Sequence, residues 1–284
     1  MSQTDSAAPS PKNENVLTPR KIVHRTHEHS HGPITRLMSP GDLGKALKPF
    51  VFLDIFEMNG AMVLPLHPHS GIATLTYLFE GSVWYEDSNG ATGTLSAGGI
   101  EWFKAANGAW HAGGPEDTHT RGFQLWVALP SDQELGPVEN IYQSPEEIKT
   151  VGPVRVLLGT YQGITSALKA PASMNYLAVQ LKAGETWRYE PPVGHTVGWV
   201  ALNSGQLQTV EKINAGELVI FESSNDAIDF HAEADTEFVL GSAVPHPHDL
   251  VMGNYSVHTS AATLKSGEQN IENVRKQLQR AGRL

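Results

Sequence analysis

The strongest constraint on the fold of this chain is a succession of short apolar runs separated by glycine-containing turns. The runs Pro49–Met58, Ala73–Gly81 and Arg121–Pro130 are rich in β-branched and aromatic residues, and Asn-Gly and Gly-Gly pairs lie between such runs. Runs of this length and composition are typical of strands, and these turns commonly join antiparallel neighbours. The pattern therefore predicts an antiparallel barrel or sandwich.

The same strand and turn pattern returns in the second half of the chain. LTYLFEGSV at residues 75–83 resembles GWVALNSGQL at 198–207, and LSAGGIEWF at 95–103 resembles INAGELVIF at 213–221. This similarity indicates an internal duplication that gives two β units side by side. The predicted organisation is a disordered, His-rich tail over 1–33, a first barrel with the metal site over 34–135, a linker over 136–153, and a second, degenerate barrel with a C-terminal segment over 154–284.

Two helices interrupt this β pattern. A C-terminal helix is expected from about Gly267 to Arg280, because its apolar residues fall on one face and its basic residues come late, where they suit the helix dipole. A second, short helix could begin at Ser144, which is a suitable N-cap before Pro145 and two acidic residues. The segment PGDLGKAL at residues 40–47 could also form a brief turn of helix.

Three histidines give the chain its candidate chemistry. His67 and His69 are two residues apart, so on a strand their side chains point to the same face. His111 follows after two turn signals and can join them if the intervening strands fold back as hairpins. Three neutral imidazoles suit a divalent transition metal such as iron, zinc, copper or nickel. The alternative is that these histidines only cap strands or satisfy polar groups.

The remaining histidines carry weaker signals. Those in the tract HRTHEHSHG could bind metal adventitiously or simply be solvated. The second half lacks a His-x-His ahead of its matching strand, and its isolated histidines are expected to be structural. The His-Pro-His in a proline-rich loop is expected to be structural or on the surface. In order, these residues are His24, His27, His29 and His31, then His195 and His231, then His246 and His248.

Composition excludes several classes of function. The chain contains no cysteine, which excludes disulfides and thiolate chemistry, and its formal net charge is −10. An acidic chain argues against direct, non-specific nucleic-acid binding. No apolar run is long enough to cross a membrane, and the polar N-terminus does not look like a secretory signal. We expect a cytoplasmic location without membrane association.

Five segments of the chain, in this order, resemble the pirin family: KPFVFLDIFEM, HPHSGIATLTYLFEGSVWYEDSNG, AGGIEWFKAANGAWHAGGP, GFQLWVALP and VMGNYSVHTS. The resemblance extends from about Ile34 to the C-terminal helix and is most specific in the first half. It implies an all-β bicupin, with two antiparallel barrels of the cupin or jelly-roll type in tandem and a short C-terminal helix. It also implies one metal, usually iron, in the first barrel.

Carried over by position, the family's first three ligands fall on His67, His69 and His111. The fourth, a glutamate two residues after the third histidine, falls on Gly113, which has no side chain. Water could complete the coordination, or another carboxylate could substitute. Because the carboxylate is missing, zinc, nickel, copper or manganese remain alternatives to iron. The candidate carboxylates are Glu101 on the preceding strand and Glu116 and Asp117 just beyond.

Two activities are associated with proteins that resemble this one. One is a quercetin dioxygenase, in which the metal orients a flavonol for reaction with dioxygen. The other is a non-enzymatic, metal- or redox-responsive regulator that binds a protein partner. The sequence does not choose between a small aromatic substrate and a protein partner. The enzyme needs an aromatic-lined pocket, for which the candidates are Phe52, Phe56, Tyr77, Trp102 and Trp110, with packing in the core as the alternative for each.

Overall fold

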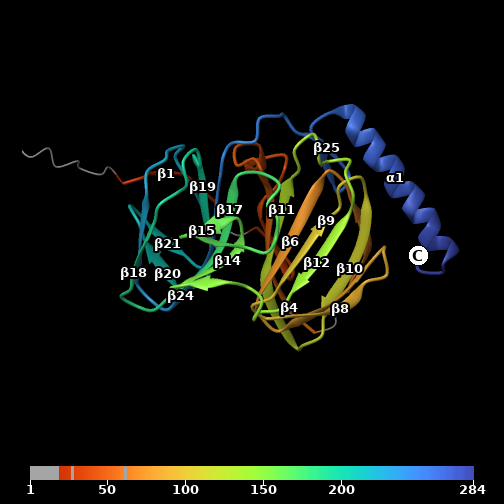
Figure 1. Cartoon of the computed structure of the whole chain (residues 1–284). Helices are drawn as coiled ribbons and strands as arrows, with labels where there is room; N and C mark the ends of the chain where they lie inside the picture. The colour runs from red at the N-terminus through yellow and green to blue at the C-terminus, as the bar shows by residue number, and fades with distance from the viewer. Residues whose placement is uncertain (1–18, 27–28, 61–62) are drawn as a thin grey trace, which may run out of the picture.

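The computed structural model describes residues 19–26, 29–60 and 63–284, and shows two β units side by side with one long helix at the outer edge of the first (Figure 1). Each unit combines a seven-stranded and a four-stranded sheet, and all pairings between named strands are antiparallel. This confirms the predicted all-β class, with two antiparallel units in tandem and a C-terminal helix.

The first unit holds the three candidate histidines. Its four-stranded sheet has the order β5 (Leu64–His69), β10 (Ala109–Pro115), β7 (Ser82–Asp87) and β8 (Thr92–Ser96). Its seven-stranded sheet has the order β12 (Glu139–Gln143), β9 (Ile100–Lys104), β6 (Ile72–Glu80), β11 (His119–Ala128), β4 (Phe50–Asn59), β3 (Ile34–Met38) and β2 (His29–His31). A 3-10 turn, Leu43–Lys45, precedes β4.

The second unit repeats this plan. Its four-stranded sheet has the order β18 (Thr186–Tyr189), β23 (Ile228–Ala232), β20 (Gln206–Gln208) and β21 (Lys212–Asn214). The seven-stranded sheet has the order β1 (Ile22–Thr26), β22 (Leu218–Phe221), β19 (Val197–Ser204), β24 (Thr236–Ala243), β17 (Met174–Leu181), β14 (Val154–Leu158) and β13 (Thr150–Val151). Two small hairpins form separate two-stranded sheets. In one, β15 (Thr160–Tyr161) pairs with β16 (Ile164–Thr165), and in the other, β25 (Val251–Gly253) pairs with β26 (Ser256–His258).

The order of strands supports the duplication that the sequence indicates. Strands β9, β6, β11, β4 and β3 of the first unit occupy the places of β22, β19, β24, β17 and β14 in the second. The four-stranded sheets match in the same way, with β5 and β10 in the places of β18 and β23. Two segments that look alike in sequence, residues 95–103 and 213–221, each form the outer hairpin strand and the sheet strand that follows it.

The two seven-stranded sheets pack against each other through the largest apolar cluster. Leu53 and Ile55 of β4 belong to this cluster, together with Tyr176 and Trp199 of the second unit. Because side chains alternate along a strand, the intervening residues of β4 point the other way, toward the four-stranded sheet of their own unit. These intervening residues therefore line the space between the two sheets of the first unit. That space holds the candidate site.

The N-terminal segment corrects one prediction. Residues 1–18 and His27 lie outside the described residues, but 19–26 and 29–33 are not part of a disordered tail. Strand β1 pairs with β22 of the second unit, and Arg20 donates from Nε to the carbonyl of Glu222 at 2.7 Å. Strand β2 pairs with β3 of the first unit. Backbone pairing and one buried arginine therefore order a stretch whose polar composition predicted disorder.

The segment predicted as a linker, 136–153, also contains ordered strands. β12 adds to the edge of the first unit, with Ile141 opposite Trp102. The short helix expected after Ser144 does not form. Residues 145–147 make a turn in which the Ser144 amide donates to the Glu147 carboxylate at 2.7 Å. Strand β13 begins at Thr150, so too few residues remain for a helix to propagate.

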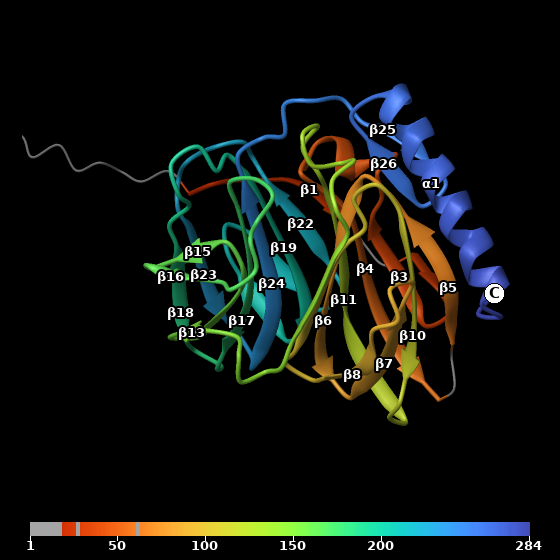
Figure 2. The same ribbon diagram turned by 45° about the vertical axis from the view of Figure 1, so that its right-hand side comes forward.

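The C-terminal helix α1 (Ala261–Arg280) is longer than predicted and begins before Gly267. Ser260 caps it, because its hydroxyl accepts a hydrogen bond from the Thr263 amide at 3.2 Å. The helix lies along the first unit beside β10 (Figure 2). The Trp110 indole donates to the carbonyl of Ile271 at 3.1 Å. Among the described residues, no helix combines the length and apolar character that crossing a membrane requires.

Candidate metal centre

Strands β5 and β10 bring the three histidines together. In their antiparallel ladder His67 lies directly opposite His111, and His69 lies two pairs further along, opposite Ala109. One potential ligand atom from each of the three imidazoles lies within 4.8 Å of the other two. Among the described residues this is the only such group of potential metal ligands. The His-x-His spacing and the returning hairpin therefore place the side chains where the sequence predicted.

Each imidazole has an acceptor at its Nδ1 atom. His67 Nδ1 lies 2.8 Å from the carbonyl of Pro65, and His69 Nδ1 lies 3.0 Å from the carbonyl of Tyr255. His111 Nδ1 lies 3.3 Å from the carboxylate of Glu101. Carbonyl and carboxylate oxygens can only accept, so Nδ1 carries the proton in all three rings. This tautomer leaves each Nε2 with a free lone pair for a metal.

The Nε2 atoms have the environment of ligands rather than of structural groups. Those of His69 and His111 are buried and have no hydrogen-bond partner. Burial, with the nearby His111 as a smaller contribution, lowers the pKa of His67 to about 4 and that of His69 well below its ordinary value. Neutral imidazoles with unpartnered Nε2 atoms fit a divalent metal, since only the deprotonated nitrogen can bind it.

Glu101 is a buried carboxylate beside this group. It accepts hydrogen bonds from Thr76 Oγ1 at 2.9 Å, from His111 Nδ1 at 3.3 Å and from the Tyr142 hydroxyl at 3.4 Å. Burial alone would raise its pKa, but His111 and the Thr76 hydroxyl outweigh burial and hold the pKa of Glu101 below its ordinary value. Because Glu101 contacts the nitrogen of His111 opposite Nε2, it orients that ring from behind and is not placed as a fourth ligand.

The other suggested carboxylates are further from the site. Glu116 and Asp117 are exposed, and Asp117 accepts a hydrogen bond from the Ser82 hydroxyl at 2.8 Å. Gly113 lies beyond an irregularity in the pairing of β10 with β5. A Cβ atom there would lie 3.0 Å from the carbonyl of Trp84, so even a methyl group would press on the neighbouring strand. Among the residues that the structure describes, no carboxylate therefore joins the three histidines.

Two cavities meet at the three histidines. The inner cavity lies between the sheets and encloses about 70 Å³, with His67, Glu101, His111 and Gly113 in its wall. It has room for only a few waters or a comparably small molecule. The outer cavity encloses about 550 Å³ and touches His67 and His69. This volume falls within the range of pockets that hold drug-sized ligands.

The outer cavity has an aromatic wall from β4 and β11. Phe52 and Trp126 stack with ring centroids 4.1 Å apart, and His69 lies against Trp126 with centroids 4.8 Å apart. The guanidinium of Arg36 lies 3.9 Å from the centre of the Phe52 ring and is paired with Asp54. An organic ligand in this cavity would contact aromatic faces on one side and two of the histidines on the other.

Not all of the aromatic residues predicted to line the pocket do so, because side chains alternate between the two faces of a strand. Phe52 lines the outer cavity and Phe56 the inner one. Tyr77 and Trp102 instead face the second unit in the large apolar cluster, and Trp110 packs under α1. The sequence analysis missed Trp126 and the C-terminal residues of the outer wall. The alternation of side chains along β11 could have identified Trp126. Its neighbour Leu125 faces the second unit, so Trp126 must point to the opposite face of the sheet. The C-terminal wall residues are Met252, Asn254 and Tyr255.

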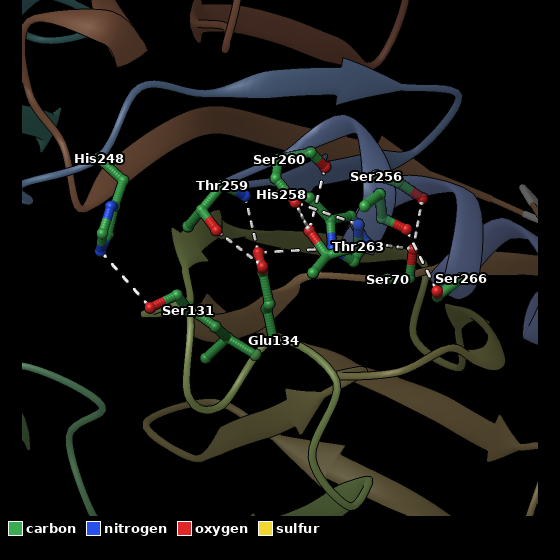
Figure 3. Close-up of polar contacts among 12 residues, drawn as sticks. Ser70, Ser131, Glu134, His248, Ser256, His258, Thr259, Ser260, Thr263 and Ser266 are labelled. Carbon is green, nitrogen blue, oxygen red and sulfur yellow. Dashed lines mark hydrogen bonds and ion pairs between the residues drawn. The ribbon is translucent and has the colours of Figure 1, made fainter.

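A buried polar network holds that C-terminal wall in place (Figure 3). The Ser70 hydroxyl donates to Ser256 at 2.9 Å and lies 2.9 Å from His258 Nε2. Glu134 accepts from the Thr259 amide and hydroxyl, both at 2.7 Å. These contacts hold β26 beside Ser70, which directly follows His69 in the chain. They thereby hold the Tyr255 carbonyl where it accepts from His69.

Four other histidines divide between buried and exposed positions. His195 is buried and bonded on both nitrogens, to Ser173 at 2.9 Å and to Ser242 at 3.0 Å. His231 is exposed on β23. His246 is buried, with Nε2 3.4 Å from the carbonyl of Leu129. His248 lies in the same exposed loop region, 3.5 Å from the Ser131 hydroxyl.

Comparisons with known proteins agree with this architecture. Residues 17–127 match the family model described as Pirin. A Pseudomonas aeruginosa protein provisionally named a quercetin 2,3-dioxygenase is 34% identical over 193 residues, which cover 62% of this chain and 68% of that protein.

Two solved structures share the fold. The crystal structure of a quercetin 2,3-dioxygenase from Acinetobacter baumannii superposes with a TM-score of 0.83 at 22% identity, covering 91% of this chain and 98% of that one. The structure of the bacterial pirin YhhW from Escherichia coli in complex with nickel(II) gives a TM-score of 0.65 at 19% identity, covering 80% and 98% of the two chains.

Proposed function

Since this chain belongs to the pirin family, we propose that it is a metal-dependent dioxygenase that acts on a small aromatic substrate of the flavonol class, such as quercetin. The observation that carries this proposal is the set of three imidazoles whose Nδ1 atoms all face acceptors, while a cavity of about 550 Å³ touches two of the rings. The names of the similar Pseudomonas and Acinetobacter proteins give further support.

His67, His69 and His111 would hold the metal through Nε2. A bound divalent metal supplies an electrophilic centre that polarises an oxygen substituent of the substrate and brings it together with dioxygen. We propose iron, as the family resemblance implies. Imidazole ligands also suit nickel, zinc and copper, and nickel is the metal in the similar E. coli structure. Three protein ligands leave positions open for exogenous molecules.

The protein's own residues would bind and orient the organic substrate. Phe52 and Trp126 offer stacked aromatic faces, and Met252 and Tyr255 form the opposing wall of the outer cavity. Stacking against these faces would place one edge of a flavonol beside His67 and His69 and keep bulk water from that edge. The inner cavity of about 70 Å³ is too small for a flavonol, so we assign it to water or dioxygen.

The first test is the metal content of purified, tag-free protein, with a variant in which all three histidines are alanine. We expect near-stoichiometric transition metal in the wild type and its loss in the variant. The variant His24→Ala/His27→Ala/His29→Ala/His31→Ala is a matched control that excludes metal carried by the His-rich tract. Wild-type protein that stays metal-free after reconstitution contradicts the proposal.

The second test is oxygen uptake by the metal-loaded protein in the presence of a flavonol. We expect uptake that depends on both metal and substrate, and weaker substrate binding in Trp126→Ala, which removes half of the stacked wall. Phe79→Ala is a matched aromatic control, because this partly buried residue packs against the large apolar cluster and lines neither cavity. Metal-loaded protein that consumes no oxygen with any flavonol contradicts the assignment as a flavonol dioxygenase.

A further inference from the structure

The charges around the three histidines are unusual for a site that is to hold a dication. Gly113 contributes no side chain, and a Cβ atom there would already lie 3.0 Å from the Trp84 carbonyl. The ligands offered are three neutral imidazoles. A buried dication with only neutral ligands lacks a compensating charge, which is costly in a medium of low dielectric constant. A nearby anion outside the ligand set would offset this cost.

Glu101 is such an anion and lacks a cation of its own. It is 7% exposed, and its hydrogen-bond partners are Thr76, His111 and Tyr142. Among the described residues, no lysine or arginine forms an ion pair with it. Asp54, the other carboxylate in the inner cavity wall, is neutralised by two hydrogen bonds from Arg36. A buried carboxylate without a cationic partner is expensive unless a positive charge binds nearby.

The path between this anion and the metal position is short and rigid. His111 lies between them, with Nδ1 toward Glu101 at 3.3 Å and Nε2 toward the other two histidines. Phe103 stacks on the His111 ring with centroids 4.3 Å apart and planes inclined by 3°, so the ring cannot turn freely. A carboxylate that accepts from the far nitrogen of a histidine ligand raises the basicity of that ligand.

We infer that Glu101 supplies the negative charge of the metal centre through His111, in place of a carboxylate ligand at position 113. The inference rests on the proposed function, since it presumes a metal at the three histidines. Glu101 is a positioning residue: it fixes the His111 tautomer and offsets the charge of the metal without touching it. The coordination positions that a carboxylate ligand would occupy then stay open toward the inner cavity, whose wall includes Gly113.

The test compares Glu101→Gln with wild type and with Asp54→Asn. The second variant is a matched control, because it removes the charge of the other carboxylate in the wall of the inner cavity. Affinity for Ni²⁺ and for Zn²⁺ is measured by competition with a chelator of known affinity, and unfolding temperature is measured with and without metal. We expect Glu101→Gln to weaken metal binding by about 10- to 100-fold. Asp54→Asn should change the affinity much less, because the side-chain hydrogen bonds of Asp54 come from Arg36 and not from a histidine of the site. Glu101→Met replaces the Gln variant if the amide prevents folding.

The metal-free unfolding temperature separates this role from a structural one. Without metal, Glu101→Gln should unfold close to the wild-type temperature, because glutamine keeps the size of Glu101 and an oxygen that can accept from His111. Its unfolding temperature should rise less on adding metal. Unchanged metal affinity, or an affinity loss matched by Asp54→Asn, overturns the inference. Wild-type protein that binds no metal overturns the proposed function instead, so the two failures are distinguishable.

Discussion

The two units of this protein share one scaffold but use the space between their sheets differently. The ladder of β10 with β5 in the first unit corresponds to the ladder of β23 with β18 in the second. Aligned at their first pairs, Ala109–His69 corresponds to Ile228–Tyr189. The positions of His67, His69 and His111 are then taken by Trp187, Tyr189 and Phe230.

These three aromatic residues are buried in the apolar core of the second unit, and the rings of Trp187 and Phe230 lie 5.4 Å apart. In the first unit the same positions border two cavities, one of which lies between the two sheets. A cavity of about 460 Å³ also touches Trp187 and Phe230, but its wall includes exposed residues of β18 and β23 such as Arg188 and Asp229. The comparison teaches that one β scaffold can either fill its interior for stability or leave it open for a site. At the place of His111 the second unit has Phe230, and His231 is the next residue along β23.

The largest expected difference between the units is the cost of truncating corresponding residues. Trp187→Ala should destabilise the protein by about 3–5 kcal/mol, because it leaves a void in a filled core. The corresponding His67→Ala should cost only about 1 kcal/mol in metal-free buffer, since His67 already borders two cavities. Equilibrium denaturation with urea checks both values. Equal losses would contradict the assignment of a filled and an open unit.

The next difference is in the response to acid. The pKa of His67 is about 4 in the folded protein against an ordinary value of 6.5, because burial disfavours the charged ring. The unfolded chain therefore binds more protons between these two values, so the stability that is present above pH 6.5 declines as the pH falls toward 4. For His67 alone the loss is about 3 kcal/mol in metal-free protein.

This acid loss should be reduced in His67→Ala, and bound metal should protect against it because metal competes with the proton. Denaturation at several pH values between 7 and 4, with and without metal, provides the measurement. His231→Ala serves as a matched control in the second unit, since that histidine is exposed and should leave the pH profile unchanged. A wild-type profile that is flat over this range contradicts the burial argument.

The smallest expected effect concerns helix α1, which lies along the first unit (Figure 2) and, within the described part of the chain, has no counterpart on the second. Ser260→Ala removes the N-cap and should cost about 1 kcal/mol. Hydrogen exchange should increase in α1 and in the adjacent β10, and not in β23 of the second unit. Faster exchange spread evenly over both units would show that the helix does not act locally.

Much of the candidate site follows from local sequence. The His-x-His spacing and the glycine turns are enough to predict that His67, His69 and His111 meet on one face, because strand alternation and hairpin return are local rules. The duplication was visible in two matched segments for the same reason. The end of α1 at Arg280 was predicted, but its start was not, since Ser260 caps the helix before its apolar pattern becomes regular.

The failures of the sequence analysis share one cause, which is dependence on residues far along the chain. Nothing near residue 22 indicates that β1 pairs with β22, and polar composition alone predicted disorder there. Tyr77 and Trp102 were candidates for the pocket, but only the packing of one unit on the other decides which face of each strand is buried in the interface.

The sequence by itself thus determined an all-β duplicated fold and the identity of the three candidate ligands, since both depend on spacings of a few residues. Only the tertiary structure decided what surrounds them. The acceptor for His69 is the carbonyl of Tyr255, 186 residues away, and the acceptor for His111 is Glu101 on a strand of the other sheet. Tautomer, charge balance and cavity shape are set by such distant contacts, because packing brings together groups whose separation in the chain carries no information about their distance in space.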